Sequence, residues 1–562
     1  MRFFMKTYQR RKLMIVLLLC VLGLGMLFAR LMYLMVLGSA YYEKKAQNLH
    51  ERERYIKAPR GKIYDRNGIL LADNLTVCTV SVIHNQVKQP KKVARMLAKE
   101  LELPFLWVQK RVAKVTAIEK IKSNVDKTVG DRVLSYGYAG VKVDEDKKRF
   151  YPNGKLASKV LGFAGGENQG ILGLEVQYEK RLKGRNGCIL TLTDARGMEL
   201  LNAPKRRIAP VRGADLYTTL DYTIQYYCQQ AAEKICKEKK ARHVSIIVMN
   251  PQDGGIYAMV DIPEYNLNRP FMKNMSMKQL NERWRNGCIN DTYEPGSIFK
   301  IITSCAGMEE GVVSETDRFY CPGYKIVGDR RIHCHKVKGH GSQNFAQGLM
   351  NSCNPVFIEL GLRLGVEKYF RYFEQFGLYG KTGIDLPGEA KTIMHDKKNV
   401  GPVELATISF VQSFQITPIK LATTVSSLVN GGRLITPHVC GYFKDSKGKK
   451  MYCRYKPGRR IVSKKTSKKM AKLLRKVVAE GTGNKAEIEG YEIGGKTATS
   501  QTLPRSAHKY ISSFLGFEPA KKPTVLALIT VKEPKGIYYG GTIAAPVIRN
   551  IFENILPYLR NR

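Results

Sequence analysis

The sequence predicts an α+β protein with one N-terminal transmembrane helix, a mostly β middle region, and a C-terminal antiparallel sheet covered by helices. Three observations support this prediction. A basic head precedes a long apolar run, an Asn-Gly turn joins two apolar strands within residues 60–70, and strand-like segments flank helix-like ones within residues 215–562. A chain of 562 residues has room for about two to four domains and at least one large core.

The N-terminal segment has the pattern of a membrane anchor. Residues 1–12 are basic without an acidic side chain, and residues 13–38 are apolar except for Arg30, which lies near enough to the outer end to snorkel. This predicts a cytoplasmic tail over 1–12, a single-pass anchor over 13–38 and an extracellular remainder. A signal peptide cleaved after residues 38–40 is the alternative. The apolar run is longer than an ordinary signal-peptide core, which favours the anchor.

The folded part follows a charged, helix-compatible segment, residues 41–60, which predicts a stalk. A large separate domain is expected to begin near Asp215. Its first predicted element is a helix capped by Asp221, whose apolar face carries Ile224, Cys228, Ala231 and Ile235. A hairpin of 244–249 and 256–260 follows, and strands 511–517 and 525–531 come later in the chain. Pro546 opens a final helix with an apolar face made of Ile548, Ile551, Phe552, Ile555 and Leu559.

A candidate nucleophile lies at Ser297. Pro295 and Gly296 favour a turn, and the apolar-rich run that follows favours a helix. Ser297 would then lie in the first turn, where free N–H groups and the positive helix end favour a developing negative charge. Lys300, three residues on, would lie on the same face, and a neutral lysine can activate a serine. Such a pair on a solvated helix is common by chance, so further motifs are needed.

Two later motifs complete a pattern. Ser352-Cys353-Asn354 follows a helix-like run, and Lys496-Thr497-Ala498-Thr499 lies near the C-terminus after two glycines. Ser-x-x-Lys, then Ser-x-Asn, then Lys-Thr-(small residue) is the order found in penicillin-recognising serine enzymes. The chain resembles class B penicillin-binding proteins, which are membrane-anchored D,D-transpeptidases of peptidoglycan synthesis.

The resemblance covers nearly the whole chain. The string from Arg60 to Leu70 is similar to the one that opens the family's non-catalytic pedestal, and residues 149–154 and 170–175 resemble later pedestal landmarks. It implies a pedestal (dimerisation-type) domain over 39–214 and a transpeptidase (penicillin-binding) domain over 215–562. No glycosyltransferase motif precedes residue 215, which argues against the bifunctional class A relatives.

The resemblance also implies the catalytic roles. Ser297 would attack the carbonyl of a D-Ala-D-Ala donor, and Lys300, with its pKa lowered by burial and by Lys496, would accept the serine proton. Ser352 would pass a proton to the leaving amine while Lys496 holds its hydroxyl. An amine from a neighbouring stem peptide would resolve the acyl-enzyme.

The resemblance also implies which residues contact the substrate. Asn354 offers both a donor and an acceptor to the substrate amide, and Thr497 and Thr499 would bind the terminal carboxylate. The backbone N–H groups of Ser297 and Thr499 would form the oxyanion hole. β-Lactams are expected as inhibitors because their strained amide and carboxylate resemble D-Ala-D-Ala. The chemistry needs no cofactor.

The chain departs from the family pattern at two places. Ala498 stands where relatives usually have glycine, and its methyl group is expected to crowd a strand edge that substrate approaches. Residues 409–413 lack the glycine that usually follows the phenylalanine. Neither change removes a catalytic group, but both bear on substrate fit and β-lactam affinity.

Cysteines and histidines gather between the first two motifs, at Cys321, His333, Cys334, His335, His340 and Cys353. Cys-x12-Cys with scattered histidines is not a recognised zinc spacing, so no metal site is predicted. Two interpretations remain. One is a Cys334–Cys353 disulfide in an oxidising compartment, which would gate the site by redox state. The other is three buried, unpaired thiols. Sporulation-specific members of the family carry cysteines at similar places, which points toward that subgroup.

The partners expected from the resemblance are peptidoglycan stem peptides as donor and amine acceptor, β-lactams, the membrane and a membrane-embedded glycan polymerase. Nucleic acid is not expected despite a formal charge of +45, because basic residues are spread along the chain without a nucleic-acid-binding motif. The predicted function is peptidoglycan cross-linking in division or spore cortex synthesis. The alternatives are a D,D-carboxypeptidase or β-lactamase, and a weakly active scaffold that activates the polymerase.

Overall fold

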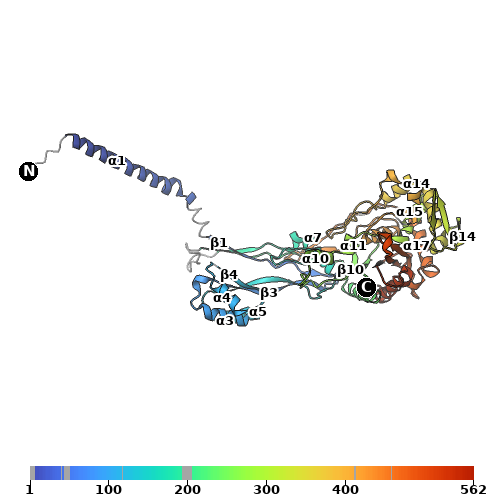
Figure 1. Cartoon of the computed structure of the whole chain (residues 1–562), viewed down its shortest axis with the longest axis horizontal. Coiled ribbons are helices and arrows are strands. Elements are labelled where there is room, and N and C mark those ends of the chain that lie inside the picture. Colours follow the sequence, from blue (N-terminus) through green and yellow to red (C-terminus); the bar gives the residue numbers. More distant parts are fainter. Residues whose placement is uncertain are drawn as a thin grey trace, which may run out of the picture. The chain divides into compact units, whose positions relative to one another are not determined.

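The computed structural model describes residues 7–39, 41–42, 51–116, 118–192, 206–410, 413–456 and 458–561. The chain divides into two compact units. The first comprises Met1–Ala58, Thr76–Asp146 and Arg185–Val211, and the second comprises Pro59–Leu75, Lys147–Gly184 and Arg212–Arg562. The units alternate along the chain, so neither is one continuous stretch of sequence (Figure 1).

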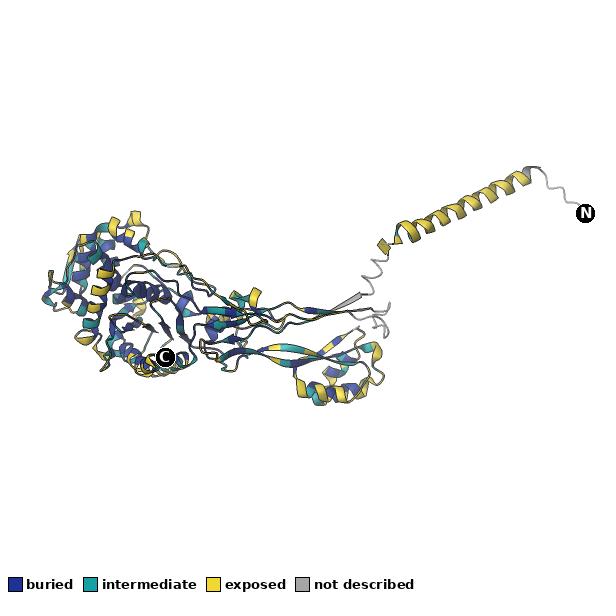
Figure 2. Cartoon of the chain, turned by 180° about the vertical axis from the view of Figure 1, so that it is seen from behind, coloured by how far each residue is buried: buried dark blue, intermediate teal, exposed yellow. Residues whose placement is uncertain are grey.

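The predicted anchor segment forms a helix. Helix α1 (Thr7–Met32) continues into a π-helical turn, η1 (Tyr33–Leu37), and an 18-residue stretch within the 28 residues Arg10–Leu37 has a mean hydropathy of 2.5. Their side chains are exposed nearly throughout, as Figure 2 shows for α1, although most are apolar. The segment is therefore long and apolar enough to cross a membrane. Ala40, the last residue of the alternative cleavage site, lies outside the described residues.

The prediction of a helix-compatible stalk is wrong for residues 51–56, which form a strand. Strand β1 (Glu51–Ile56) pairs antiparallel with β6 (Gly187–Leu192), which pairs with β7 (Arg206–Ile208). Pairing with a strand far along the chain outweighs the helix propensity of a short charged segment, because an isolated short helix is marginal in water. Residues 43–50 of the predicted stalk lie outside the described part of the chain.

A small apolar core forms the rest of the first unit. Strand β4 (Glu119–Asp126) pairs antiparallel with β3 (Leu70–Val82), and β5 (Val141–Phe150) also pairs with β3. Three helices belong to this core, namely α3 (Pro90–Glu100), α4 (Phe105–Val112) and α5 (Lys127–Ser135). The middle region thus carries helices as well as strands.

Buried ion pairs join the pedestal landmarks inside the second unit. The Arg60 side chain donates to Glu175 Oε2 at 2.9 Å, and both side chains are fully buried. Arg149 Nε donates to the other carboxylate oxygen at 2.6 Å, and Tyr151 OH donates to it at 3.3 Å. Removing one partner of such a pair costs about 3–5 kcal/mol because a buried charge is left uncompensated. The three sequence landmarks therefore pack as one cluster.

The Asn-Gly turn is confirmed. Strand β2 (Ile63–Tyr64) pairs antiparallel with β3, and Gly68 in the turn has a φ of +87°. On its other side β2 pairs parallel with β8 (Asp215–Thr218). Strand β8 pairs with β15 (Cys440–Lys444), and β15 pairs with β16 (Lys450–Tyr452).

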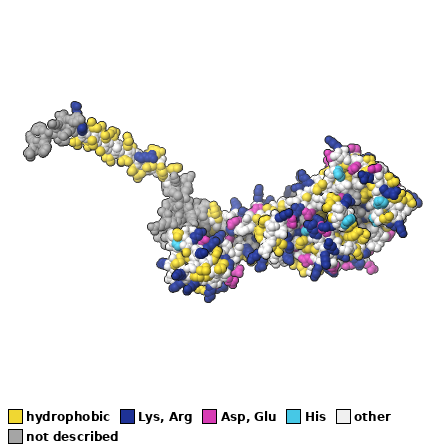
Figure 3. Space-filling view, viewed as in Figure 1, with side chains coloured by type: hydrophobic (Ala, Val, Ile, Leu, Met, Phe, Trp, Pro, Cys, Tyr) yellow, Lys and Arg dark blue, Asp and Glu magenta, His cyan; other side chains and the backbone are white. Residues whose placement is uncertain are grey.

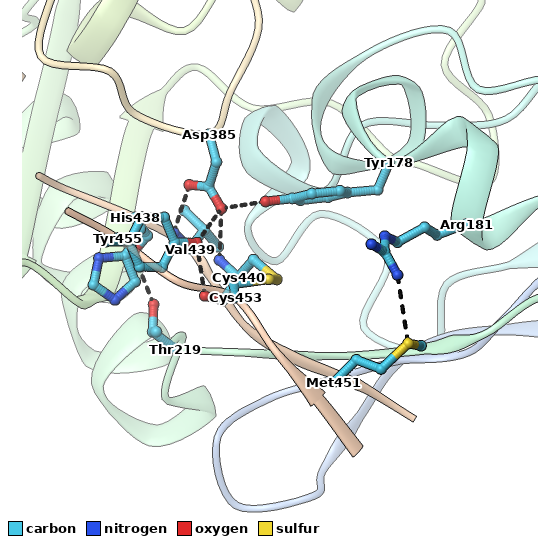
Figure 4. Close-up of a disulfide and its surroundings, with 10 residues drawn as sticks. All are labelled: Tyr178, Arg181, Thr219, Asp385, His438, Val439, Cys440, Met451, Cys453 and Tyr455. Atoms are coloured by element: carbon cyan, nitrogen blue, oxygen red, sulfur yellow. Dashed lines mark hydrogen bonds between the residues drawn. A yellow bond between two sulfur atoms is a disulfide. The ribbon is translucent and has the colours of Figure 1, made fainter. Parts of the chain in front are cut away.

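A disulfide that the sequence analysis did not single out lies beside β15. Cys440 and Cys453 are bonded, at a sequence separation of 13 (Figure 4). The Asp385 carboxylate accepts hydrogen bonds from the backbone N–H groups of Val439 and Cys440 and from Tyr178 OH, each at 2.7 Å. The disulfide and this carboxylate together hold the start of β15 in place.

The second unit contains the predicted antiparallel sheet, in the order β10-β9-β19-β18-β17. Its strands are β9 (His243–Met249), β10 (Ile256–Ile262), β17 (Gly494–Gln501), β18 (Tyr510–Glu518) and β19 (Val525–Lys532). The predicted hairpin and the two predicted C-terminal strands are confirmed. Strand β17, which carries the third motif, lies at the sheet edge.

Helices cover both faces of this sheet. Ile246 and Val248 contribute to one apolar core, whereas Ile247 and Met249 contribute to another, as expected for side chains that alternate along a strand. The first core includes α9 (Tyr222–Glu238), capped by Asp221 as predicted, and α19 (Ala545–Arg560). The second includes α12 (Lys300–Glu309), α14 (Asn354–Gln375), α15 (Pro402–Phe410), α16 (Pro418–Val429) and α17 (Lys464–Ala479).

Basic side chains are dispersed over the surface. Figure 3 shows Lys and Arg side chains across the visible face, interleaved with Asp and Glu rather than gathered in one stripe. A nucleic-acid interface would concentrate its basic residues on one face or along one helix.

Candidate active site

Ser297 lies in a short 3-10 turn, η3 (Gly296–Phe299), that runs directly into α12. Residues three apart eclipse one another in such a turn, which brings Ser297 and Lys300 to the same side. Ser297 is half-buried and Lys300 is fully buried. The regular helix thus begins at Lys300, after the turn that holds Ser297.

The turn rests directly on the edge strand. Gly296 has a φ of +60°, and a Cβ built on it would lie 2.9 Å from the Cβ of Ala498 in β17. Ala498 is itself buried. The extra methyl group at this position therefore fills the space next to Gly296, and glycine is required there.

Gly296→Ala is expected to lower the rate of acylation by a labelled penicillin by about 10²-fold. The added methyl group would push the Ser297 turn away from β17, and a displacement of about 1 Å at a reacting group can cost that much. The double variant Gly296→Ala, Ala498→Gly is expected to recover part of the rate, because the collision is removed.

Gly311→Ala is the matched control for this prediction. Gly311 has a φ of +69°, but nothing lies within 4 Å of a Cβ built on it. Its variant carries the backbone strain of about 1–2 kcal/mol without a collision. Equal loss of acylation in the two single variants would contradict the role assigned to the Gly296–Ala498 contact.

Lys300 connects the first motif to the second. Its Nζ donates hydrogen bonds to the Ser352 carbonyl oxygen and to Asn354 Oδ1, both at 2.8 Å, and lies 3.3 Å from Ser352 Oγ. Burial lowers the pKa of Lys300 to about 8. A large fraction of this amine is therefore neutral slightly above neutral pH, which a proton acceptor requires.

Ser352 is held in an unusual backbone conformation. It lies between α13 (Phe345–Met350) and α14 with a φ of +53°, and its side chain is buried. A non-glycine residue in this region costs about 1–3 kcal/mol and persists only where the surroundings fix it. The next residue, Cys353, is the N-cap of α14, and Asn354 Nδ2 donates to the His333 carbonyl oxygen at 3.1 Å.

The third motif contributes a second buried lysine. Burial and, to a smaller extent, the charge of Lys300 hold the pKa of Lys496 well below its ordinary value. Lys496 is fully buried in β17, and its Nζ donates to the Thr497 carbonyl oxygen at 3.3 Å. Lys496 was also expected to lower the pKa of Lys300, but burial is the cause of that shift. Two buried amines, one of which disfavours the charge of the other, suit a site where one proton is passed on.

A cleft of about 480 Å³ brings the predicted residues together. Its lining includes Ser297, Ser352, Asn354, Thr497 and Thr499. The two buried lysines complete the group, since one bonds Ser352 and Asn354 and the other belongs to the same strand as the threonines. The volume suits the end of a peptide. The structure thus places all the sequence-predicted site residues at one place.

Several residues that line the cleft carry no recognisable sequence motif. Glu294 lies in the cleft wall, where burial raises its pKa, and it accepts hydrogen bonds from Ser413 N at 3.1 Å and Arg505 Nη2 at 3.2 Å. Its position two residues before Gly296 was the one available signal. Thr482 and Tyr539 come from loops without a motif, and Gly540 begins the short helix α18 (Gly540–Ile543). Within the departing segment 409–413, residues 411 and 412 lie outside the described residues.

Cys334 and Cys353 are free thiols, so the disulfide considered for them is not present. With Cys321 and His340 they form a cluster whose ligand atoms all lie within 4.8 Å of one another. Spacing along the sequence did not reveal this group, because Cys353 comes from a different segment that the fold brings alongside.

Comparison with known proteins identifies the family. The model of the penicillin-binding protein transpeptidase domain matches residues 244–553, and the model of the penicillin-binding protein dimerisation domain matches residues 55–218. The chain therefore belongs to the penicillin-binding protein transpeptidase family. It is a class B peptidoglycan D,D-transpeptidase, a penicillin-binding enzyme of cell-wall synthesis.

Similar proteins support this assignment. The chain is 38% identical over 560 residues to stage V sporulation protein D of Bacillus subtilis, covering 98% of this chain and 86% of that protein. It is 26% identical to a probable peptidoglycan D,D-transpeptidase PenA of Neisseria meningitidis, covering 95% and 90%. The crystal structure of penicillin binding protein 2X from Streptococcus thermophilus has a similar fold, with a TM-score of 0.76, 22% identity and coverage of 90% and 80%.

Proposed function

We propose that Ser297 is the residue acylated during cross-linking and that Lys300 is its general base. The observation that carries this proposal is the environment of Lys300, which is fully buried, has a pKa lowered to about 8, and lies one turn from a serine in the cleft wall. Neutral Lys300 takes the Ser297 proton as the hydroxyl oxygen attacks the D-Ala-D-Ala carbonyl. The peptide C–N bond then breaks, and D-Ala leaves.

Proton delivery and substrate alignment fall to the other motif residues. Ser352 hands a proton to the departing amine, and Lys496 keeps the hydroxyl group of Ser352 in position. Asn354 orients the donor peptide, while Thr497 and Thr499 bind its terminal carboxylate. All four line the same cleft, and Lys496 is buried in the strand that carries the two threonines, which supports these assignments. The amine of a second stem peptide then attacks the acyl-enzyme and regenerates Ser297.

β-Lactams react with the same serine. Their strained amide carbonyl takes the place of the donor carbonyl, and their carboxylate takes the place of the terminal carboxylate. The amine released by ring opening stays tethered to the acyl group, so it remains in the cleft and blocks the approach of water or of an acceptor.

The domain division follows the chain from the membrane outward. Residues 1–12 form a cytoplasmic tail, 13–38 the anchor, 39–214 the pedestal and 215–562 the transpeptidase domain. Basic residues before the apolar helix support a cytoplasmic N-terminus and an extracellular catalytic domain. Anchor and pedestal are the parts through which a membrane-embedded glycan polymerase would be bound.

The cellular role proposed is wall synthesis during sporulation. The support is 38% identity to stage V sporulation protein D across almost the whole chain. A role in division is the second candidate, supported by the 26% identity to a peptidoglycan D,D-transpeptidase FtsI homolog.

Transpeptidation is tested with a pentapeptide donor that ends in D-Ala-D-Ala, with and without an amine acceptor. The expected result is D-Ala release that increases with acceptor, matched by cross-linked product. Release of D-Ala that is matched only by hydrolysed donor, whatever the acceptor concentration, would instead show a carboxypeptidase. No D-Ala release together with no penicillin labelling would show a scaffold.

A further inference from the structure

Four buried or half-buried side chains converge beside the second motif. Cys321 ends β11 (Arg318–Cys321), Cys334 follows β13 (Arg330–His333), His340 precedes β14 (Gly341–Asn344), and Cys353 caps α14. The three cysteines are buried and His340 is half-buried. The Sγ atoms of Cys321 and Cys334 each lie 3.6 Å from His340 Nδ1.

The donor set and its spacing fit one metal ion. Three thiolates and one imidazole are a ligand set of structural zinc sites. A tetrahedron with Zn–S bonds of about 2.3 Å and a Zn–N bond of about 2.0 Å places its ligand atoms about 3.5–3.8 Å apart. The two Sγ–Nδ1 distances already lie in this range, and every other pair in the cluster lies within 4.8 Å. Small side-chain rotations are enough to complete the site.

The backbone around the cluster is built for close approach. Gly323 and Gly339 have φ values of +101° and +79°, and a Cβ at Gly339 would lie 2.3 Å from the Cys321 carbonyl oxygen. His340 N donates to that same carbonyl oxygen at 3.0 Å, and Cys334 N donates to the Gly323 carbonyl oxygen at 2.8 Å. These bonds fix three of the four donors independently of any contact between the donor atoms themselves.

Neither interpretation from the sequence accounts for the whole group. A Cys334–Cys353 disulfide would use two of the donors and leave Cys321 with His340. Unpaired thiols that serve as small apolar side chains would not need a histidine among them. His335 is a poorer candidate, because it is exposed and lines the cleft, although its Nδ1 lies 3.8 Å from Cys334 Sγ.

We propose that Cys321, Cys334, His340 and Cys353 bind one Zn²⁺ ion and that this ion holds the Ser352–Asn354 turn of the active site. Cys353 lies between the two residues to which Lys300 is hydrogen bonded. Fixing its sulfur therefore fixes the left-handed Ser352 and the start of α14. Three thiols lose their protons to solvent as the ion binds, so binding tightens as pH rises. The effect on the turn rests on the function proposed for Ser352 and Asn354, whereas metal binding itself does not.

The test uses full-length protein without a histidine tag, kept reduced in detergent. Zinc per chain is measured by mass spectrometry, and the visible spectrum is recorded after exchange with Co²⁺. The wild type is expected to hold one zinc ion and to show the bands of tetrahedral, thiolate-bound cobalt, and Cys321→Ser is expected to lose both. Labelled-penicillin acylation is expected to fall about 10–100-fold in Cys321→Ser, the range seen when groups that support a site are lost.

Cys228→Ser is the matched control, because Cys228 is a buried free thiol in α9, outside the cluster. It is expected to keep its zinc and its acylation rate. Reduced wild-type protein that holds no zinc and takes up no cobalt overturns the proposal, as does Cys321→Ser with one zinc ion. Should that variant not fold, chelation of the wild type replaces it: faster thiol labelling supports the site, and unchanged labelling overturns it. Bound zinc without any penicillin labelling would count against the proposed function alone.

Discussion

Ser297→Ala is expected to lower the rates of penicillin labelling and of cross-linking by about 10⁴-fold or more. Removing the nucleophile of a serine acyl-transfer enzyme typically costs that much, because only the oxyanion donors and substrate binding remain. Ser297 is the hydroxyl that the structure places in the cleft wall on the same side of its turn as Lys300. Stopped-flow or gel measurements with a fluorescent penicillin give the labelling rate directly.

Ser304→Ala is the matched control. Ser304 is a buried serine of α12, the helix that follows the Ser297 turn, and its hydroxyl has no hydrogen-bond partner among the residues that the structure describes. Its loss should change neither labelling nor stability appreciably. Labelling that persists in Ser297→Ala, or disappears equally in Ser304→Ala, would contradict the assignment of the nucleophile.

Lys300→Met is expected to lower the acylation rate by about 10²–10⁴-fold, the range for loss of a general base. Methionine fills a similar volume but can neither accept the Ser297 proton nor donate to Ser352 and Asn354. The wild-type rate should also rise with pH and level off above about pH 8, because burial lowers the pKa of Lys300 to about 8 and only the neutral amine accepts a proton. From pH 7 to the plateau this is about a tenfold increase.

Lys420→Met separates catalysis from burial. Burial lowers the pKa of Lys420 to about 8 as well, and its Nζ donates to the Gly377 carbonyl oxygen, but Lys420 does not line the cleft. Its replacement is expected to change thermal stability and to leave the acylation rate and its pH profile unchanged. A wild-type rate that does not vary between pH 6 and pH 9 would count against Lys300 as the base.

The parts of the fold that the sequence predicted are those with strong local patterns. The Asn67-Gly68 turn, the helix cap at Asp221 and the hairpin of 244–249 and 256–260 depend on neighbouring residues alone, and all are present. The Ser297–Lys300 pair is also local. Ser352 and Lys496 could be placed beside it only through the order of the motifs, because the contacts that unite them cross from helix to strand.

The features that the sequence did not predict depend on pairing between distant segments. Strand β1 owes its form to a partner strand more than 100 residues along the chain. Nothing near Cys440 marks Cys453 as its partner, and nothing near Cys321 marks Cys353. Ala231 was expected on the buried face of α9, whereas Ala232 takes that place, because the exact rotation of a helix is set by packing.

The parallel pairing of β2 with β8 has a consequence for the order in which the protein matures. Ile63 lies opposite Leu216, and Arg60 reaches Glu175, so residues 59–75 belong to the unit that carries the active site although they are made far ahead of it. During synthesis, more than a hundred further residues must be added before β8 can pair with β2 and before Glu175 can pair with the Arg60 guanidinium. Until then, the edge of β2 and the charge of Arg60 have no partner from these segments. A chain shortened to begin at Asp215 would keep β8 and its partner β15 but would lose β2, the strand that pairs with β8 on the other side.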